Sequence, residues 1–184
     1  MTFASPPSKK EVAYVTRRDQ IYKWAVYALG VLPLWLLDAY ILPRFPLWGV
    51  SPMLFPSAVA AVALWEGAYA GTGFGMAVGL LWELAYPGGF GGTVFFLALA
   101  GMISGGLTQY ALSQSLPGCL LCSAGTLAAL DGLRVAGKLI SRAASLPALL
   151  QVAVPEFLLS LLWTPVIYLL FRAIYRRVGG TKLA

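Results

Sequence analysis

The residues best suited to chemistry in this sequence are its acidic side chains, because five of only seven lie within or at the edges of long apolar segments. These five are Asp38, Glu66, Glu83, Asp131 and Glu156. An ionised carboxylate near the centre of a bilayer costs about 2.5–3.5 kcal/mol, so such groups generally face a protein interior, a water-filled cavity or a partner. Three roles stay open for each carboxylate: structural pairing, contact with a partner, or contact with a transported substrate.

Other reactive side chains are scarce. The sequence contains no histidine, and its only two cysteines, Cys119 and Cys122, are spaced like a thioredoxin-type redox pair. The pair lies inside an apolar segment without a strand–helix context, so we interpret it as packing. We find no Ser-His-Asp, Cys-His or Rossmann motif, and no Lys-Ser/Thr follows the glycines around Gly71 as a P-loop requires. The sequence favours a non-enzymatic protein without a metal ion or cofactor.

The elements that must position these residues are membrane helices. Of 184 residues, 59% are hydrophobic and 11% charged, whereas a soluble domain carries about 25% charged residues. Apolar runs of about 20 residues match a hydrocarbon core of about 30 Å. We therefore expect an all-α polytopic membrane protein in the lipid bilayer. Its single transmembrane domain would span 21–178, between a basic tail at 1–20 and a C-terminal tail at 179–184.

Six membrane spans are expected, at 21–42, 52–70, 74–86, 93–112, 116–131 and 148–171. The stretch 51–86 would be roughly 54 Å long as one helix, which is too long for one crossing, so we place a break at Gly71-Thr72-Gly73. Pro33 predicts a mild kink in the first span. A re-entrant third span would instead leave five crossings.

Basic residues gather at the two ends of the chain and in one internal connection. The positive-inside rule then places both termini in the cytoplasm. This distribution lacks the basic face of a nucleic-acid binder, so we expect no nucleic-acid binding. The connection at 132–147 carries Arg134, Lys138 and Arg142 at i, i+4 and i+8, which predicts an amphipathic segment lying at the membrane interface.

Gly67, Gly71, Gly75 and Gly79 recur every four residues. In a bilayer, a face of small residues lets two helices approach until their backbones pack. We interpret this face as a helix contact, made within the chain or with the helix of a partner. Gly101 repeats the same spacing with Gly105 in the fourth span.

The six-span arrangement gathers most of the charged groups at the outer level of the membrane. Four acidic residues, Asp38, Glu83, Asp131 and Glu156, fall in the outer half, and only Glu66 falls toward the cytoplasm. The basic residues at the outer level are Arg44, Arg134, Lys138 and Arg142. We predict an outer polar zone centred on Glu83, which forms either an internally paired lid or a surface that receives a partner.

The segment 71–92, GTGFGMAVGLLWELAYPGGFGG, resembles the glycine-rich second and third spans of MreD, the rod shape-determining membrane protein. In that family a G-x-x-x-G-L-L-x-Asp stretch precedes a glycine-containing loop, and here Glu83 stands at the position of the aspartate. Chain length, the basic start, six spans and the basic end of the last span are also similar to MreD.

This resemblance implies a non-enzymatic scaffold subunit of the cell-elongation complex in the bacterial cell membrane, which regulates cell shape and peptidoglycan synthesis. It implies an MreC-like partner, with MreB, RodA and a class B penicillin-binding protein in the same complex. MreD is also similar in fold to the substrate-binding subunits of energy-coupling-factor vitamin transporters, which gives an alternative function. Such a subunit would show Ala-x-x-x-Ala in its first span, whereas Ala25 and Ala28 are three residues apart here.

Overall fold

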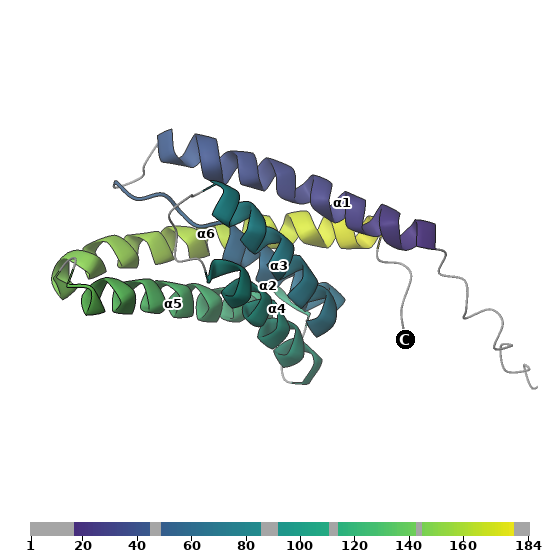
Figure 1. Ribbon diagram of the computed structural model, residues 1–184. Helices are drawn as coiled ribbons and strands as arrows, with labels where there is room; N and C mark the ends of the chain where they lie inside the picture. Colours follow the sequence, from purple (N-terminus) through teal and green to yellow (C-terminus); the bar gives the residue numbers. More distant parts are fainter. Residues whose placement is uncertain (1–16, 45–48, 86–91, 111–113, 143–144, 179–184) are drawn as a thin grey trace, which may run out of the picture.

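The computed structural model describes residues 17–44, 49–85, 92–110, 114–142 and 145–178, and this part of the chain is all-α (Figure 1). Its helices are α1 (Arg17–Leu36), α2 (Phe55–Glu66), α3 (Ala68–Ala85), α4 (Thr93–Tyr110), α5 (Leu116–Ile140) and α6 (Leu146–Val178). The helical class predicted from composition is confirmed. Three segments are long and apolar enough to cross a membrane, namely Gln20–Arg44, Leu116–Ile140 and Leu146–Val178, and Phe55–Glu66 and Thr93–Gln109 are shorter apolar helices.

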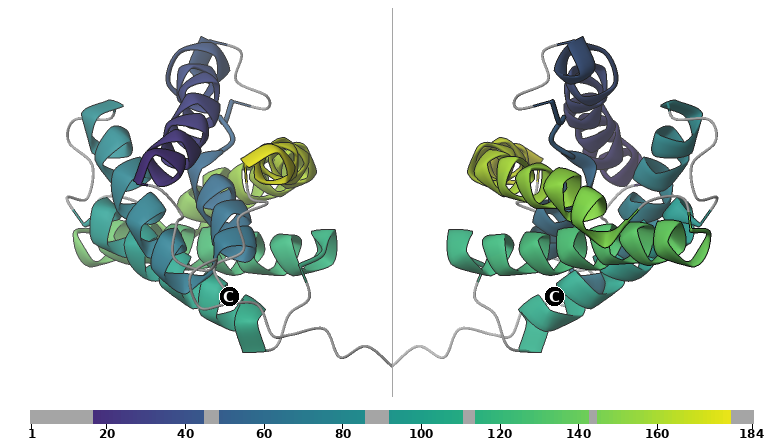
Figure 2. Two further views of the ribbon diagram at one scale, coloured as in Figure 1. Left: turned by 90° about the vertical axis from the view of Figure 1, so that its right-hand side faces the viewer. Right: turned by 90° about the vertical axis from the view of Figure 1, so that its left-hand side faces the viewer.

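The short helix α2 forms the centre of the fold. All of its residues from 55 to 64 are buried, and it packs against α3, α4, α5 and α6. Figure 2 shows α2 surrounded by the other helices when the molecule is viewed end-on. A helix that is apolar on every side belongs in an interior. At 1.5 Å per residue its 12 residues extend about 18 Å, less than the hydrocarbon core of about 30 Å, so the expected second span at 52–70 is too long.

The break after α2 falls at Gly67, and the predicted break at Gly71-Thr72-Gly73 is wrong. Gly67 has φ +88°, a left-handed conformation that glycine adopts without steric cost, and this turn separates α2 from α3. The three residues of the predicted break lie inside α3, where Gly71 meets the backbone of α4 and Gly73 is exposed.

The first membrane segment ends in irregular helical turns. After α1, a π-helical turn (Leu37–Ile41) and a 3-10 turn (Leu42–Arg44) continue the helix two residues beyond the expected end of span one at 42. Pro33 lies within α1, and as it has no backbone N–H it removes one helical hydrogen bond shortly before the π turn. In this turn Asp38 is buried, with only 3% of its surface exposed.

The last two helices are longer than the sequence predicted. We expected α5 to end at Asp131, but it continues to Ile140 through Gly132 and Gly137, so most of the expected connection at 132–147 is helical. Helix α6 has 33 residues and contains both Pro155 and Pro165. Figure 1 shows α5 and α6 side by side as a long hairpin.

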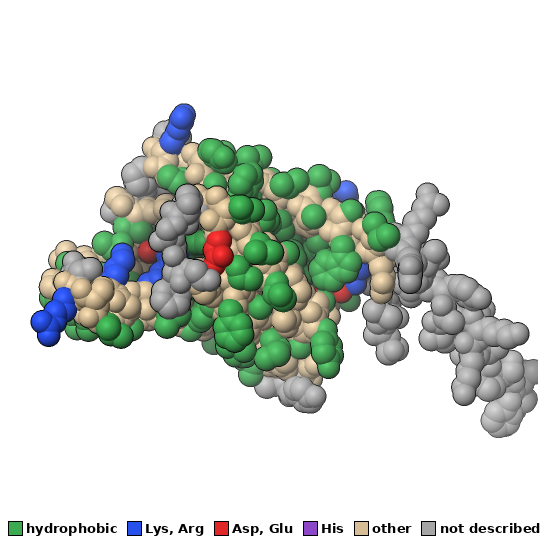
Figure 3. All heavy atoms as spheres, in the orientation of Figure 1, with side chains coloured by type: hydrophobic (Ala, Val, Ile, Leu, Met, Phe, Trp, Pro, Cys, Tyr) green, Lys and Arg blue, Asp and Glu red, His purple; other side chains and the backbone are tan. Residues whose placement is uncertain are grey.

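The helix ends are divided between the two ends of the bundle, and the surface between them is largely apolar. The start of α1 and the end of α6 lie at one end, and the end of α5 and the start of α6 lie at the other (Figure 1). Large apolar side chains point outward along the helices, including Leu29, Leu84, Phe95 and Leu162, and Figure 3 shows how much of one face is apolar. An apolar surface of this extent suits a hydrocarbon environment.

Candidate functional site

A polar cavity of about 220 Å³ lies near the end of α1 and the beginning of α2. Five separate parts of the chain supply its walls, and three of the lining residues are charged. The lining residues are Asp38, Ser51, Pro52, Met53, Trp82, Arg134 and Glu156, and we call this site the polar cavity throughout. Residues separated by more than a hundred positions in the sequence therefore share one site.

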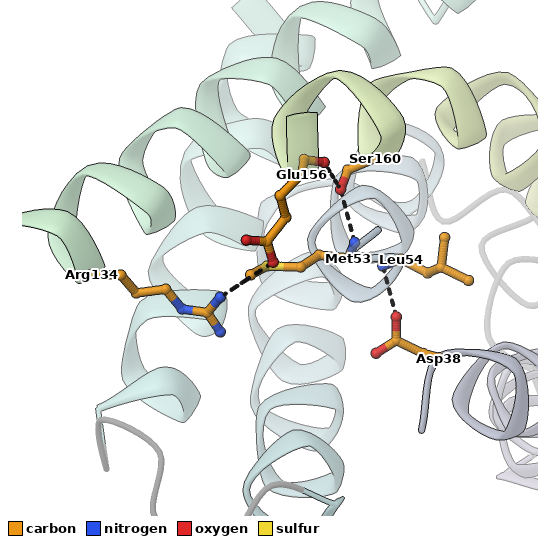
Figure 4. Close-up of polar contacts among 6 residues, drawn as sticks. All are labelled: Asp38, Met53, Leu54, Arg134, Glu156 and Ser160. Atoms are coloured by element: carbon orange, nitrogen blue, oxygen red, sulfur yellow. Dashed lines mark hydrogen bonds and ion pairs between the residues drawn. The ribbon is translucent and has the colours of Figure 1, made fainter. Parts of the chain in front are cut away.

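Arg134 of α5 is the most connected of these residues. Its Nη1 lies 3.7 Å from Oε1 of Glu156 on α6 and donates a hydrogen bond of 3.3 Å to Sδ of Met53 (Figure 4). Its guanidinium carbon lies 5.3 Å from the centre of the Trp82 ring on α3, within the range of a cation–π interaction. One cation thus connects α3, α5, α6 and the segment before α2.

The start of α2 is held in place by side chains from two other helices. Oδ1 of Asp38 accepts a hydrogen bond of 3.2 Å from the N–H of Leu54. Oγ of Ser160 accepts one of 2.8 Å from the N–H of Met53 and donates one of 2.6 Å to the carbonyl oxygen of Glu156. The first N–H groups of a helix have no partner within the helix, and a nearby carboxylate also suits the positive end of the helix dipole.

The structure brings together part of the predicted outer polar zone. Asp38, Arg134 and Glu156 line the polar cavity, which forms around Arg134 and not around Glu83. Glu83 follows Gly79 by four residues and so continues the glycine row of α3, while Trp82 occupies the face toward Arg134. Oε1 of Glu83 is buried without a hydrogen-bond partner among the described residues.

The remaining residues of the predicted zone are spread out. Asp131 is buried on α5, three residues before Arg134, and its Oδ2 has no hydrogen-bond partner within the described ranges. Arg44 is exposed in the 3-10 turn. Arg142 follows the end of α5 with φ +53°, so it does not extend the helical stripe predicted for the basic residues.

Glu66 lies at the opposite end of the bundle, as predicted. Its Oε2 forms an ion pair with Nζ of Lys23, and its Oε1 accepts a hydrogen bond of 2.8 Å from the hydroxyl of Tyr27. Tyr27 is buried and stacks on Phe171, with 6.2 Å between ring centres. Sequence reasoning missed this cluster, although the spacing of Lys23 and Tyr27 by four residues places both on one face of α1.

The glycine row of α3 packs against α4. A Cβ atom on Gly71 would come within 2.7 Å of the carbonyl oxygen of Gly101, and one on Gly79 within 2.5 Å of Cα of Val94. A Cβ on Gly75 would overlap the backbone of α4 in the same way. Backbone contact at this distance is possible only without side chains. We call this interface the glycine contact.

Only part of the four-residue glycine repeat belongs to the glycine contact. Gly105 of α4 faces the backbone of Ala68 at the start of α3. Gly67 belongs to the turn before α3, and a Cβ atom there would lie 2.9 Å from Nε2 of Gln109. The four-residue repeat in the sequence therefore combines three contact glycines with one turn glycine.

A second hollow opens on the other side of α4, where a groove of about 360 Å³ separates it from α5. Its walls are almost entirely apolar, and a Cβ atom on Gly125 would meet nothing within 4 Å. The lining residues are Phe96, Leu99, Ala100, Ile103, Ser104, Leu107, Leu121, Cys122, Gly125, Thr126 and Ala129. We call it the lateral groove. Cys119 and Cys122 are both buried free thiols, and only Cys122 lines it.

Comparisons with protein-family models, curated proteins and solved structures find no match to this chain. Within the described part of the chain, no group of three or more acidic or cysteine residues is placed to hold a metal ion. The features that can carry a function are therefore the polar cavity, the glycine contact and the lateral groove.

Proposed function

We propose that this protein is a non-enzymatic membrane subunit that binds a transmembrane helix of a partner protein in the lateral groove. The observation that carries the proposal is the groove itself, an apolar gap of about 360 Å³ between two helices of the bundle. Packing of apolar side chains to high density is the usual state of a protein interior. A gap of this size between α4 and α5 is suited to a further apolar element.

The shape of the groove favours a helix over a flat surface as its occupant. On α5 the residues Leu121, Gly125 and Ala129 follow one another at intervals of four, so they form one row along the helix. Ala100 of α4 faces the same space. Small residues in the middle of such a row permit the close approach on which helix association in lipid depends.

We propose further that the partner is an MreC-like protein and that the complex is the cell-elongation machinery. The resemblance of 71–92 to MreD supports this assignment, and the same resemblance brings MreB, RodA and a class B penicillin-binding protein into the proposed assembly. Six helical segments in the membrane with both termini in the cytoplasm are part of the proposal, and α2, at about 18 Å, is too short to cross the hydrocarbon core by itself. The common end shared by the start of α1 and the end of α6 supports this topology (Figure 1).

Site-specific photo-crosslinking tests the proposal. The protein is co-expressed with the MreC-like protein of its own organism, with a benzophenone amino acid at Leu121 in the groove or at Leu162 on α6. Leu162 is 72% exposed and does not line the groove, so it is the matched control. We expect a crosslink to the MreC-like protein from position 121 and none from 162. Crosslinks of equal strength from both positions, or from neither, would contradict the proposal.

The second candidate is a substrate-binding subunit of an energy-coupling-factor vitamin transporter, and the polar cavity is the observation that favours it. Its volume of about 220 Å³ is below the range of about 300–1,000 Å³ typical of sites for drug-sized ligands, which counts against a vitamin. Purification in mild detergent separates the two candidates. Peptidoglycan-synthesis proteins should co-purify under the first proposal, and a transmembrane coupling subunit with ATPases under the second.

A further inference from the structure

We infer that the polar cavity binds a small organic cation, a compact aliphatic amine held by the carboxylates of Asp38 and Glu156. Neither the proposed scaffold function nor the transporter alternative assigns a ligand of this class. Two carboxylates and one guanidinium line the space, so the lining carries one excess negative charge when all three groups are ionised.

Asp131 adds a third carboxylate to this region and Lys138, whose charge also acts on Glu156, adds a second cation, so one excess negative charge remains when all five groups are ionised. Asp131 lies on the same face of α5 as Arg134, three residues earlier, and it is buried with 9% of its surface exposed. One of its carboxylate oxygens has no hydrogen-bond partner among the residues that the structure describes. Uncompensated negative charge is expensive within a membrane protein, so a mobile cation would lower the free energy of this region.

The walls favour an organic cation over a metal ion. The described acidic residues do not converge into a metal-binding group. Beside the charged groups, the cavity presents the apolar surfaces of Pro52, Met53 and Trp82, which would cover a short hydrocarbon chain. An alkylammonium ion offers both parts, since its N–H groups donate to carboxylates and its carbon chain packs against apolar side chains.

Arg134 should oppose amine binding, whereas the carboxylates should favour it. Its guanidinium already lies 3.7 Å from Glu156, so it competes with an incoming ammonium group for that carboxylate. Removing its charge should therefore strengthen amine binding. A site for an anion or for the carboxylate of a zwitterion would respond in the reverse direction, because Arg134 would be its anchor.

The experiment measures ligand-induced changes in melting temperature with the full chain in lipid nanodiscs. The probes are 1,4-diaminobutane and n-butylamine, with n-butanol and butanoate as neutral and anionic controls. We expect saturable stabilisation by the amines alone. Asp38→Asn and Glu156→Gln should weaken the apparent affinity at least about tenfold, the loss typical of a charged hydrogen bond, and Arg134→Gln should strengthen it.

Glu66→Gln is the matched control, because Glu66 is a partly buried carboxylate at the other end of the bundle. Amine affinity should not change in this variant. The inference is overturned if neither amine stabilises a protein that folds normally, if butanol acts equally well, or if Arg134→Gln abolishes binding. Failure here leaves the lateral groove untouched, since its lining shares no residue with the polar cavity.

Discussion

Helix α4 packs against α2 in the centre of the fold, and it meets its two other neighbours, α3 and α5, in opposite ways. Toward α3 it presents glycines and backbone at contact distance, with Gly101 against Gly71. Toward α5 it presents larger apolar side chains across a gap of about 360 Å³. Small residues occur on both sides. The glycines of the glycine contact are covered by the backbone of the neighbouring helix, whereas Gly125 of α5 has no neighbouring atom within 4 Å of a Cβ position. A glycine in a membrane helix therefore does not by itself predict close packing, because the result depends on which surface lies opposite to it.

Leucine at Gly75 should have the largest effect, because it breaks the glycine contact at its centre. The backbone of α4 at Leu97 fills the space that a side chain would need, and backbone cannot move aside as a flexible side chain can. We expect Gly75→Leu to cost more than about 3 kcal/mol and to prevent accumulation of folded protein. Size-exclusion chromatography of a fluorescent fusion measures this loss. A monodisperse Gly75→Leu variant with wild-type yield would show that α3 and α4 separate without cost.

The same substitution at Gly125 should leave folding intact and remove partner binding. Nothing lies within 4 Å of a Cβ atom at Gly125, so leucine fits in the free protein and fills the lateral groove. Gly73 of α3 is exposed and also open, which makes Gly73→Leu the matched control. We expect only Gly125→Leu to lose co-purification with the MreC-like protein. Equal binding by both variants would show that the partner docks elsewhere.

Glu83 tests the end of the glycine contact, since it continues the row of glycines on α3. One of its carboxylate oxygens is buried without a hydrogen-bond partner in the described segments. We expect Glu83→Gln to change the free energy of unfolding by less than about 1 kcal/mol, whereas Glu83→Lys should cost about 2–3 kcal/mol, because it buries a longer, oppositely charged side chain.

Adding a second substitution to Glu83→Lys tests whether Arg134 or Arg44 forms an ion pair with Glu83. If Glu83 pairs directly with Arg134 or Arg44, as the paired-lid alternative for the outer polar zone predicts, a second change to glutamate at that arginine should restore stability to Glu83→Lys. The position of Arg134 beside Glu156 leads us to expect no rescue by Arg134→Glu. Thermal melts in nanodiscs of the single and double variants measure the coupling.

Much of the helical class followed from the sequence because lipid imposes a simple rule. Every backbone group must be paired within the membrane, so long apolar runs become helices. The exact ends did not follow. Gly67 and Gly71 are the same residue type four positions apart, yet one forms the turn and the other a contact. Only the position of α4 distinguishes them, and that position depends on tertiary packing.

The polar cavity could be predicted in part for a similar reason. Counting residues from the ends of the spans placed Asp38, Arg134 and Glu156 at one level of the membrane, and they line one cavity. Counting residues gives the depth of a side chain along a helix but not the direction in which it points. The sequence therefore predicts Glu83 at the centre of the outer polar zone, whereas Trp82 is the residue of α3 that lines the cavity. The contact of Met53 with Arg134 is not predictable from sequence, because it comes from the residues before α2, which have no regular secondary structure.

Alanine gives the smallest and sharpest test of the comparison, because one methyl group should change stability in opposite directions at the two sites. In a helix interior, alanine is more favourable than glycine by about 1 kcal/mol. At Gly125 that gain is unopposed because the neighbouring space is empty, so Gly125→Ala should raise the melting temperature, and Gly73→Ala should do the same. At Gly79 the methyl group would press on the backbone of Val94 at 2.5 Å, so Gly79→Ala should lower it despite the same gain in propensity. Stabilisation at all three positions would mean that the glycine contact has room for a methyl group. The two sides of α4 would then differ only in how much space they leave, and not in whether a side chain fits.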